Sequence, residues 1–219
     1  MPDALSPVDV DRNTLNRGAE DAPAPRKRPK PGERRVQILQ TLAAMLEQPG
    51  SERITTSALA ARLCVSEAAL YRHFASKAQM FEGLIEFIEH SVFSLINQIS
   101  ERETATSEGA VVTDGSRQAA KIITMLLQFA EKNPGMARVM VGDALVFENE
   151  RLQQRMNLFL DKVESALKQA LRTGPGRDAA MVAGVASAFI AGRLQRYARS
   201  GFKRFPTENL DASLALILG

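Results

Sequence analysis

Cysteine and histidine are scarce in this chain. It holds one cysteine, Cys64, and two histidines, His73 and His90, among 219 residues. One cysteine cannot form an internal disulfide, so nothing favours an oxidising compartment. One cysteine and two histidines are also too few for a four-ligand Cys/His zinc site. The sequence therefore predicts neither a disulfide nor a metal site.

Long hydrophobic runs are also missing. The longest charge-free apolar run is Ala179–Gly192, fourteen residues, whereas a membrane-spanning helix needs roughly 20. The N-terminus is polar and acidic and has no signal-peptide segment. We expect a soluble cytoplasmic protein that does not contact membranes.

The residue patterns of common enzymes are absent too. There is no glycine-rich phosphate loop, no cluster of metal ligands and no supported Ser/His/Asp arrangement. The acids Asp143, Glu148 and Glu150 have no partner that would make them catalytic. We expect no enzymatic activity and no cofactor.

The positive charge is confined to one quarter of the chain. Residues 1–25 carry a net charge of −3, residues 26–77 a net charge of +6, and residues 78–219 are neutral. This distribution is expected where one segment faces a polyanion. Charge alone fits a solvated basic face and a flexible tail equally well.

The chain divides into three segments. Residues 1–32 hold six of the ten prolines and almost no apolar periodicity, which predicts a disordered arm. Its basic end, residues 26–30, is either a DNA-contacting arm or a solvating tail. Residues 33–78 predict a three-helix, helix-turn-helix DNA-binding domain, and residues 79–219 a helical C-terminal domain. No stretch alternates convincingly with period two, so the predicted fold class is all-α.

The helix boundaries follow from proline, glycine and capping residues. Pro49-Gly50 ends a first helix, Ser66 caps a short one, and Ser76 with Gln79 forms a capping box for a long helix to about Glu101. Residues 102–113 read as a polar loop. Further helices are predicted over 115–132, 135–146, 148–173 and 178–201, and a last short one after Pro206 with Thr207 as N-cap.

The long helix has two apolar sides. One arc of about 120° predicts the core stripe, which consists of Phe81, Leu84, Ile85, Ile88, Val92, Leu95, Ile96 and Ile99. Met80 and Phe87 lie together on another side, which is either a docking face or a wider core contact.

The Ala/Gly-rich run Ala179–Gly192 permits close helix approach. Together with the helix over 148–173 it predicts a four-helix interface between two copies. Packing within one chain is the alternative.

Residues 53–77 carry the most informative motif, two short helices joined by a tight turn. Its expected buried positions are Ala58, Leu59, Leu63, Val65 and Leu70. Small side chains at the start of the second helix would let it enter a DNA major groove, and Glu67 and Ala68 are the candidates for base selection. Tyr71, Arg72, His73 and Lys77 would reach phosphates.

The pattern Thr55-Thr56-x-x-Leu59-Ala60, then Val65-Ser66-x-x-x-Leu70-Tyr71-x-His73-Phe74-x-x-Lys77, resembles the TetR family of dimeric bacterial DNA-binding regulators. Cys64 departs from it, because the family commonly places glycine in this turn; a left-handed non-glycine residue costs roughly 1–2 kcal/mol. The resemblance implies DNA contacts from Thr55, Thr56, Ser57, Ser66, Glu67, Ala68, Ala69, Tyr71, Arg72, His73 and Lys77.

Segments outside that motif, including 84–89, 133–135, 144–148 and 202–207, resemble the nucleoid-occlusion factors within the TetR family. The resemblance implies a homodimer that binds palindromic chromosomal DNA and, when DNA-bound, antagonises polymerisation of the division protein FtsZ. It also implies a groove for the FtsZ C-terminal tail, formed by Phe87, Met125, Gln128, Lys132 and Asn133. Leu95 departs, since a relative has arginine there.

A ligand-released TetR-family repressor is the alternative. It would need an apolar pocket among the C-terminal helices, for which Met125, Phe129, Phe159 and Phe189 are the candidate lining residues.

Overall fold

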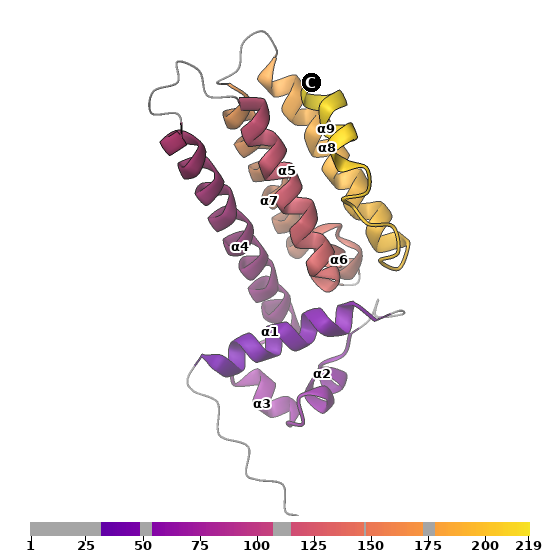
Figure 1. The fold of residues 1–219 in the computed structure, drawn as a ribbon. Helices are drawn as coiled ribbons and strands as arrows, with labels where there is room; N and C mark the ends of the chain where they lie inside the picture. Colours follow the sequence, from indigo (N-terminus) through magenta and orange to yellow (C-terminus); the bar gives the residue numbers. More distant parts are fainter. Residues whose placement is uncertain (1–31, 49–53, 107–114, 147, 173–177) are drawn as a thin grey trace, which may run out of the picture.

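The computed structural model describes residues 32–48, 54–106, 115–146, 148–172 and 178–219. Within these ranges every regular element is a helix (Figure 1), which confirms the all-α prediction. The predicted arm over 1–32 lies outside the described residues except for Gly32. The helices are α1 Glu33–Leu46, α2 Thr56–Arg62, α3 Glu67–Tyr71, α4 Lys77–Thr106, α5 Gly115–Lys132, α6 Pro134–Met140, η1 Asp143–Leu145, α7 Glu150–Leu171, α8 Ala179–Arg199 and α9 Leu210–Leu218.

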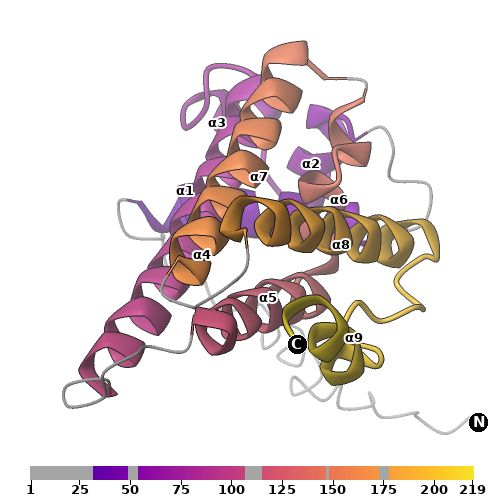
Figure 2. The same cartoon turned by 90° about the horizontal axis from the view of Figure 1, so that it is seen from above.

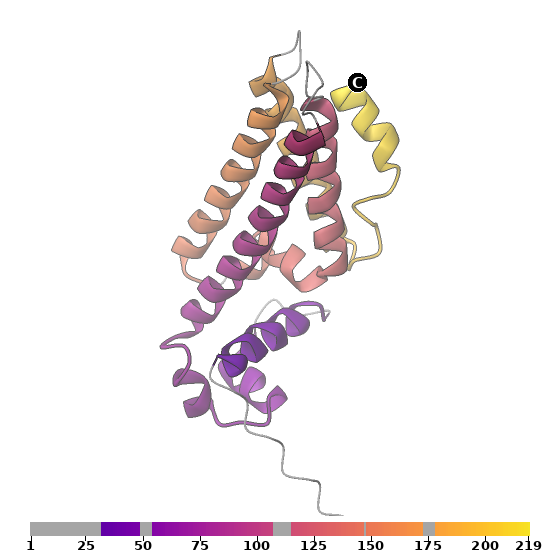
Figure 3. The same cartoon turned by 60° about the vertical axis from the view of Figure 1, so that its left-hand side comes forward.

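The first three helices form a small head at one end of the molecule. α1 crosses beneath the long helices, and α2 and α3 lie on its far side (Figure 3). α4 begins in the head and runs the length of the other part, which we call the body. One continuous helix therefore joins the two parts.

The body is a bundle of long helices. α5 and α7 lie between α4 and α8 in Figure 1, and α9 covers α5 and α8 (Figure 2). Each helix buries one apolar stripe in a common core. Phe93 of α4 meets the fully buried Phe159 of α7 edge to face, with 5.8 Å between ring centroids.

Two predicted boundaries of the body helices were wrong. α4 continues to Thr106 instead of about Glu101, so the predicted loop over 102–113 begins later; residues 107–114 lie outside the described part. The helix predicted over 135–146 is split at Gly142, which has φ +82°. A left-handed residue cannot continue an α-helix, so α6 ends and a 3-10 turn follows.

The predicted N-cap of the last helix was also wrong. Asn209, with φ +52°, precedes α9, and Thr207 lies further upstream. The Thr207 hydroxyl instead donates to a carboxylate oxygen of Glu131 on α5. A tertiary hydrogen bond therefore occupies the hydroxyl that was expected to cap the helix, and asparagine tolerates the left-handed conformation found at position 209.

The two sides predicted for α4 are partly confirmed. Residues of the predicted stripe from Phe81 to Ile96 are buried, apart from the half-buried Leu95. Phe87 is 43% exposed, whereas Met80 is completely buried. Met80 therefore does not share an exposed face with Phe87, because the beginning of α4 also packs against α1 and α6.

The head and the body meet where α1 packs on α6. A Cβ atom added to Gly135 in α6 would lie 1.9 Å from the backbone oxygen of Ala43 in α1. The Arg138 guanidinium of α6 donates to the Gln48 carbonyl at the end of α1, at 3.2 Å. This close contact tolerates only glycine, because a backbone oxygen cannot move aside as a flexible side chain can.

We expect Gly135→Ala to destabilise the protein by about 1–3 kcal/mol, as overpacking typically does. In an open helix the same substitution would be favourable by up to about 1 kcal/mol, so the sign of the effect tests the contact. Thermal unfolding followed by circular dichroism measures it. A melting temperature equal to or above that of the wild type would show that α1 and α6 are not in close contact.

Candidate DNA-reading head and peptide groove

Both short helices of the head are capped by the residues that the sequence indicates. The Thr55 hydroxyl accepts from the Ala58 backbone N–H at 3.1 Å, and the Ser66 hydroxyl accepts from the Ala69 N–H at 3.3 Å. These bonds satisfy donors that a helix start leaves free. Thr55 and Ser66 therefore fix where α2 and α3 begin.

The turn between these helices confirms the strain expected at Cys64. Its φ is +54°, the left-handed conformation for which glycine is favoured. The Val65 N–H bonds back to the Ala60 carbonyl at 3.0 Å. The fold thus holds Cys64 in a conformation that costs energy, and α3 keeps its angle to α2.

Of the positions predicted to be buried in the head, Leu59 and Leu70 are buried, and Leu63 and Val65 are half-buried. Ala58 is exposed, contrary to the prediction, and Ala60 is buried in its place. The apolar face of α2 therefore centres on Leu59 and Ala60 and does not include Ala58.

A polar network ties α2 to α3. The Thr56 hydroxyl donates to the Glu67 carboxylate at 2.7 Å, and the Tyr71 hydroxyl lies 3.5 Å from the Thr56 oxygen. In this arrangement Glu67 already accepts a hydrogen bond. Base selection by Glu67 would therefore have to compete with Thr56.

The outer face of α3 is open. Ser66, Glu67, Ala68, Tyr71 and Arg72 are exposed, and Ala69 is half-buried. Short side chains at the beginning of the helix leave the backbone accessible. The arrangement fits a helix that enters a major groove at its N-terminal part.

Residues beside this face hold the end of α3 in place. The Arg35 guanidinium of α1 donates to the His73 carbonyl at 3.1 Å and lies 4.2 Å from the centre of the Phe74 ring. Ser57 and His73 are exposed. The end of α3 is thus fixed to α1 while its predicted DNA-contacting residues stay accessible.

Lys77, at the first position of α4, forms an ion pair with Glu148, which precedes α7. The side chains are 29% and 10% exposed, respectively. The pair joins the head to the body across 71 residues of sequence. A phosphate contact from Lys77 would have to replace this carboxylate.

If Lys77 does contact a phosphate, Glu148 competes with DNA for it. We expect Glu148→Gln to strengthen binding of a palindromic duplex roughly two- to fivefold, the range of a partly exposed ion pair. Lys77→Ala should weaken binding and lower the slope of log K against log salt by about 0.9, one phosphate contact. Fluorescence anisotropy at several salt concentrations measures both.

The matched control is Lys121→Ala, which removes a second ion pair, that of Lys121 with Glu103, in the body. This variant should bind DNA like the wild type. Equal affinity and equal salt slope for all three variants would assign the Lys77–Glu148 pair a purely structural role.

The second candidate site lies between α4 and α5. The Gln118 amide of α5 donates to the Ser100 hydroxyl of α4 at 2.9 Å, and the helices run in opposite directions (Figure 1). Phe87 lies 13 residues before Ser100 in α4, and Glu131 lies 13 residues after Gln118 in α5. Since both helices rise about 1.5 Å per residue, Phe87 lies level with the end of α5.

A hollow of about 450 Å³ opens further along the same two helices, and we call it the α9 pocket because α9 forms its third wall. Met125 and Gln128 line it, two of the five residues predicted for the partner groove. Asn133 is half-buried, and its amide donates to the Phe129 carbonyl at 2.7 Å. The α9 pocket is lined by Ile99, Arg102, Glu103, Arg117, Ala120, Lys121, Thr124, Met125, Gln128, Asp211 and Leu214.

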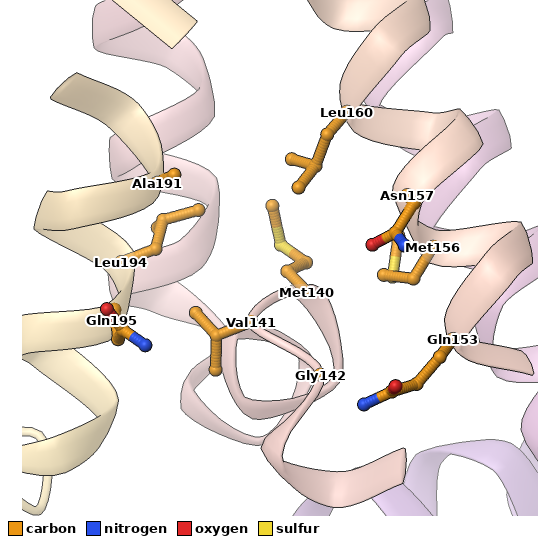
Figure 4. Close-up of a pocket in the computed structure, with 10 residues that line it drawn as sticks. All are labelled: Met140, Val141, Gly142, Gln153, Met156, Asn157, Leu160, Ala191, Leu194 and Gln195. Carbon is orange, nitrogen blue, oxygen red and sulfur yellow. The ribbon is translucent and has the colours of Figure 1, made fainter. Parts of the chain in front are cut away.

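The residues considered for a small-ligand pocket are not gathered in one place. Phe159 is buried in the core, the Phe189 ring lies under the Arg193 guanidinium, and Met125 belongs to the α9 pocket. A different hollow of about 200 Å³ lies between α6, α7 and α8 (Figure 4). Drug-sized ligands occupy roughly 300–1,000 Å³, so this hollow is small for one.

Two ionisable groups near α8 have displaced pKa values. Burial raises the pKa of Tyr197, and the negative charges of Glu131 and Glu47 raise it further. Burial and the nearby Arg196 lower the pKa of Arg193. The Tyr197 hydroxyl donates to the Glu131 carbonyl at 3.1 Å, so this pair stabilises the contact of α8 with α5.

In the described part of the chain, no three His, Cys, Asp or Glu side chains are placed to bind a metal ion. Nor does any described helix have the length and apolarity to cross a bilayer.

Comparison with known families agrees with this geometry. Residues 38–84 match the model of bacterial regulatory proteins of the tetR family, and residues 116–218 match that of the tetracyclin repressor-like, SlmA-like C-terminal domain. The first match covers the reading head and the second covers α5 to α9. The fold and the head thus define a TetR-type DNA-binding protein.

Relatives of high sequence identity show which family within the TetR class this chain belongs to. Nucleoid occlusion factor SlmA of Shewanella amazonensis is 49% identical over 191 residues, which are 84% of this chain and 92% of that protein. SlmA of Aliivibrio fischeri is 46% identical over 197 residues, 86% of this chain and 96% of that protein. The chain belongs to the SlmA family of nucleoid occlusion factors.

Solved structures show the same fold at low sequence identity. The fatty acid degradation regulator FadR from Bacillus halodurans has a TM-score of 0.68 at 16% identity and covers 87% of this chain and 97% of its own. FadR from Bacillus subtilis in complex with stearoyl-CoA has a TM-score of 0.65 at 17% identity, covering 84% and 97%. These matches confirm the architecture.

Proposed function

We propose that this protein is a nucleoid-occlusion factor: a cytoplasmic, nucleoid-associated homodimer that binds palindromic DNA and, when DNA-bound, antagonises FtsZ polymerisation. The observation that carries this proposal is Phe87, a large aromatic residue 43% exposed on α4. Exposed aromatic side chains are typical anchors for a partner. SlmA relatives over most of the chain support the same reading.

DNA binding is assigned to the open face of α3. A dimer would place two copies of α3 in successive major grooves, about 34–36 Å apart. The palindrome in the DNA would then mirror the two-fold axis of the protein. Tyr71, Arg72 and His73 would contact phosphates and fix the register, while Ala68 and Glu67 would contact bases.

The surface for dimer formation is assigned to α7 and α8. Met181, Val185 and Leu158 are exposed apolar side chains on these helices. Cβ atoms added to Gly184 and Gly192 would meet nothing within 4 Å. A second copy could therefore approach the α8 backbone closely and cover the apolar side chains.

We expect Val185→Glu to convert dimers into monomers and to weaken binding of the palindromic duplex at least tenfold, because a buried unpaired carboxylate is costly. Sedimentation velocity and DNA titration measure the two effects. The control is Leu216→Glu, which changes a residue 87% exposed on α9 and should leave the dimer intact. A dimeric Val185→Glu protein would place the interface elsewhere.

The FtsZ tail is assigned to the groove between α4 and α5. Phe87 would anchor the peptide at the end near the head, and Met125 and Gln128 line the groove further along. Lys132 is exposed at the level of Phe87 and would attract acidic residues of the tail. Asn133, which follows Lys132 before α6, completes the set.

We expect Phe87→Ala to weaken binding of a labelled FtsZ C-terminal peptide roughly 30-fold or more, since removing an anchor side chain costs about 2 kcal/mol. DNA affinity should stay unchanged, because Phe87 is remote from α3. The control is Leu216→Ala, an exposed apolar side chain outside the groove. Equal loss of DNA and peptide binding would identify Phe87 as a structural residue instead.

A further inference from the structure

The α9 pocket extends the proposed peptide groove beyond the five residues implied by the family resemblance. Only Met125 and Gln128 of that set reach it. Its third wall comes from α9, with Asp211 and Leu214. The pocket thus lies toward the far end of α4, and no partner contact has been assigned to its α9 wall.

We propose that the bound partner peptide continues into the α9 pocket, where it places an apolar side chain flanked by acidic residues. This inference rests on the proposed function, because it concerns the same peptide. It makes α9 part of the partner site and gives that helix a role in selecting the partner.

The shape of the pocket supports an apolar side chain. Its volume is about 450 Å³, and its walls carry apolar groups at Ile99, Ala120, Met125 and Leu214. Such walls would enclose a side chain of leucine or phenylalanine size. Burial of such a side chain from water favours binding.

The charges along the groove favour an acidic peptide. Lys132 lies at the near end, and Arg102, Arg117 and Lys121 line the far end. The acids of the pocket are Asp211 and Glu103, and Glu103 forms an ion pair with Lys121. Within the pocket three cations stand against two acids, and complementary charge selects the partner.

Helix geometry sets the length of the bound segment. Phe87 and Glu103 are 16 residues apart on α4, so they are separated by about 24 Å along the helix. An extended chain covers about 3.3 Å per residue. A peptide that reaches from Phe87 to the far wall of the pocket therefore needs about seven extended residues.

Substitutions in the α9 pocket of the full-length, DNA-bound protein test this inference. A labelled FtsZ C-terminal peptide is the probe, and its affinity is measured by fluorescence anisotropy. Ala120→Phe fills the pocket and should weaken binding at least tenfold. The control Ala212→Phe makes the same change at an exposed α9 residue outside the lining and should have no effect.

A second variant tests the charge argument without filling the pocket. Asp211→Lys removes an exposed acid and adds a cation, so it should strengthen binding roughly two- to fivefold. Salt should reduce the gain, because the charges are exposed to solvent. An increase in affinity cannot result from misfolding, so this variant still tests whether the peptide enters the α9 pocket if Ala120→Phe fails to fold.

Shortened peptides locate the end that enters the pocket. Removing about three residues from that end should abolish the effects of Ala120→Phe and Asp211→Lys but preserve the effect of Phe87→Ala. If both pocket variants bind the full peptide like the wild type while Phe87→Ala loses it, the extension into the pocket is wrong and the proposed function stands. If the wild type binds no peptide with or without DNA, both proposals are wrong.

Discussion

The contact between α1 and α6 is the constraint on which the arrangement of the two parts depends. Gly135 brings the α6 backbone against the Ala43 carbonyl so closely that no Cβ atom fits. This contact fixes the tilt of the head below the body, and α4 then leaves the head in a direction that the joint defines. Arg138, which donates to the end of α1, and the Lys77–Glu148 ion pair reinforce it. The reading face of α3 and the groove beside α4 therefore keep a fixed position relative to each other.

The fixed joint between head and body explains how the proposed DNA site and the proposed partner groove can be coupled through α4. α4 starts at Lys77, directly after the head, and presents Phe87 less than three turns later. A phosphate that displaced Glu148 from Lys77 would act on the first turn of α4 and on the segment before α7. The proposed partner groove begins within the same stretch. Occupancy of the DNA would thereby reach the groove over a short physical distance.

Several features could be predicted from local sequence because local interactions determine them. Ser66 caps the helix that follows it, and Cys64 has the left-handed conformation expected in the turn. The angle of Phe87 on α4 placed it off the core stripe, but left open whether it is exposed. Periodicity failed at Met80, because a helix that leaves one domain for another is covered on more than one side. The capping preference failed at Thr207, whose hydroxyl donates to Glu131 instead of capping a helix.

The sequence by itself determined the all-α fold, the reading head and most helix boundaries, since capping, turn conformation and apolar spacing act over a few residues. Only the tertiary structure decided the contacts between residues far apart in the chain. It paired Lys77 with Glu148, placed Gly135 on Ala43, and brought Asp211 and Leu214 of α9 to the groove of α4 and α5. No local pattern encodes these contacts, because each depends on how whole helices pack around a shared core.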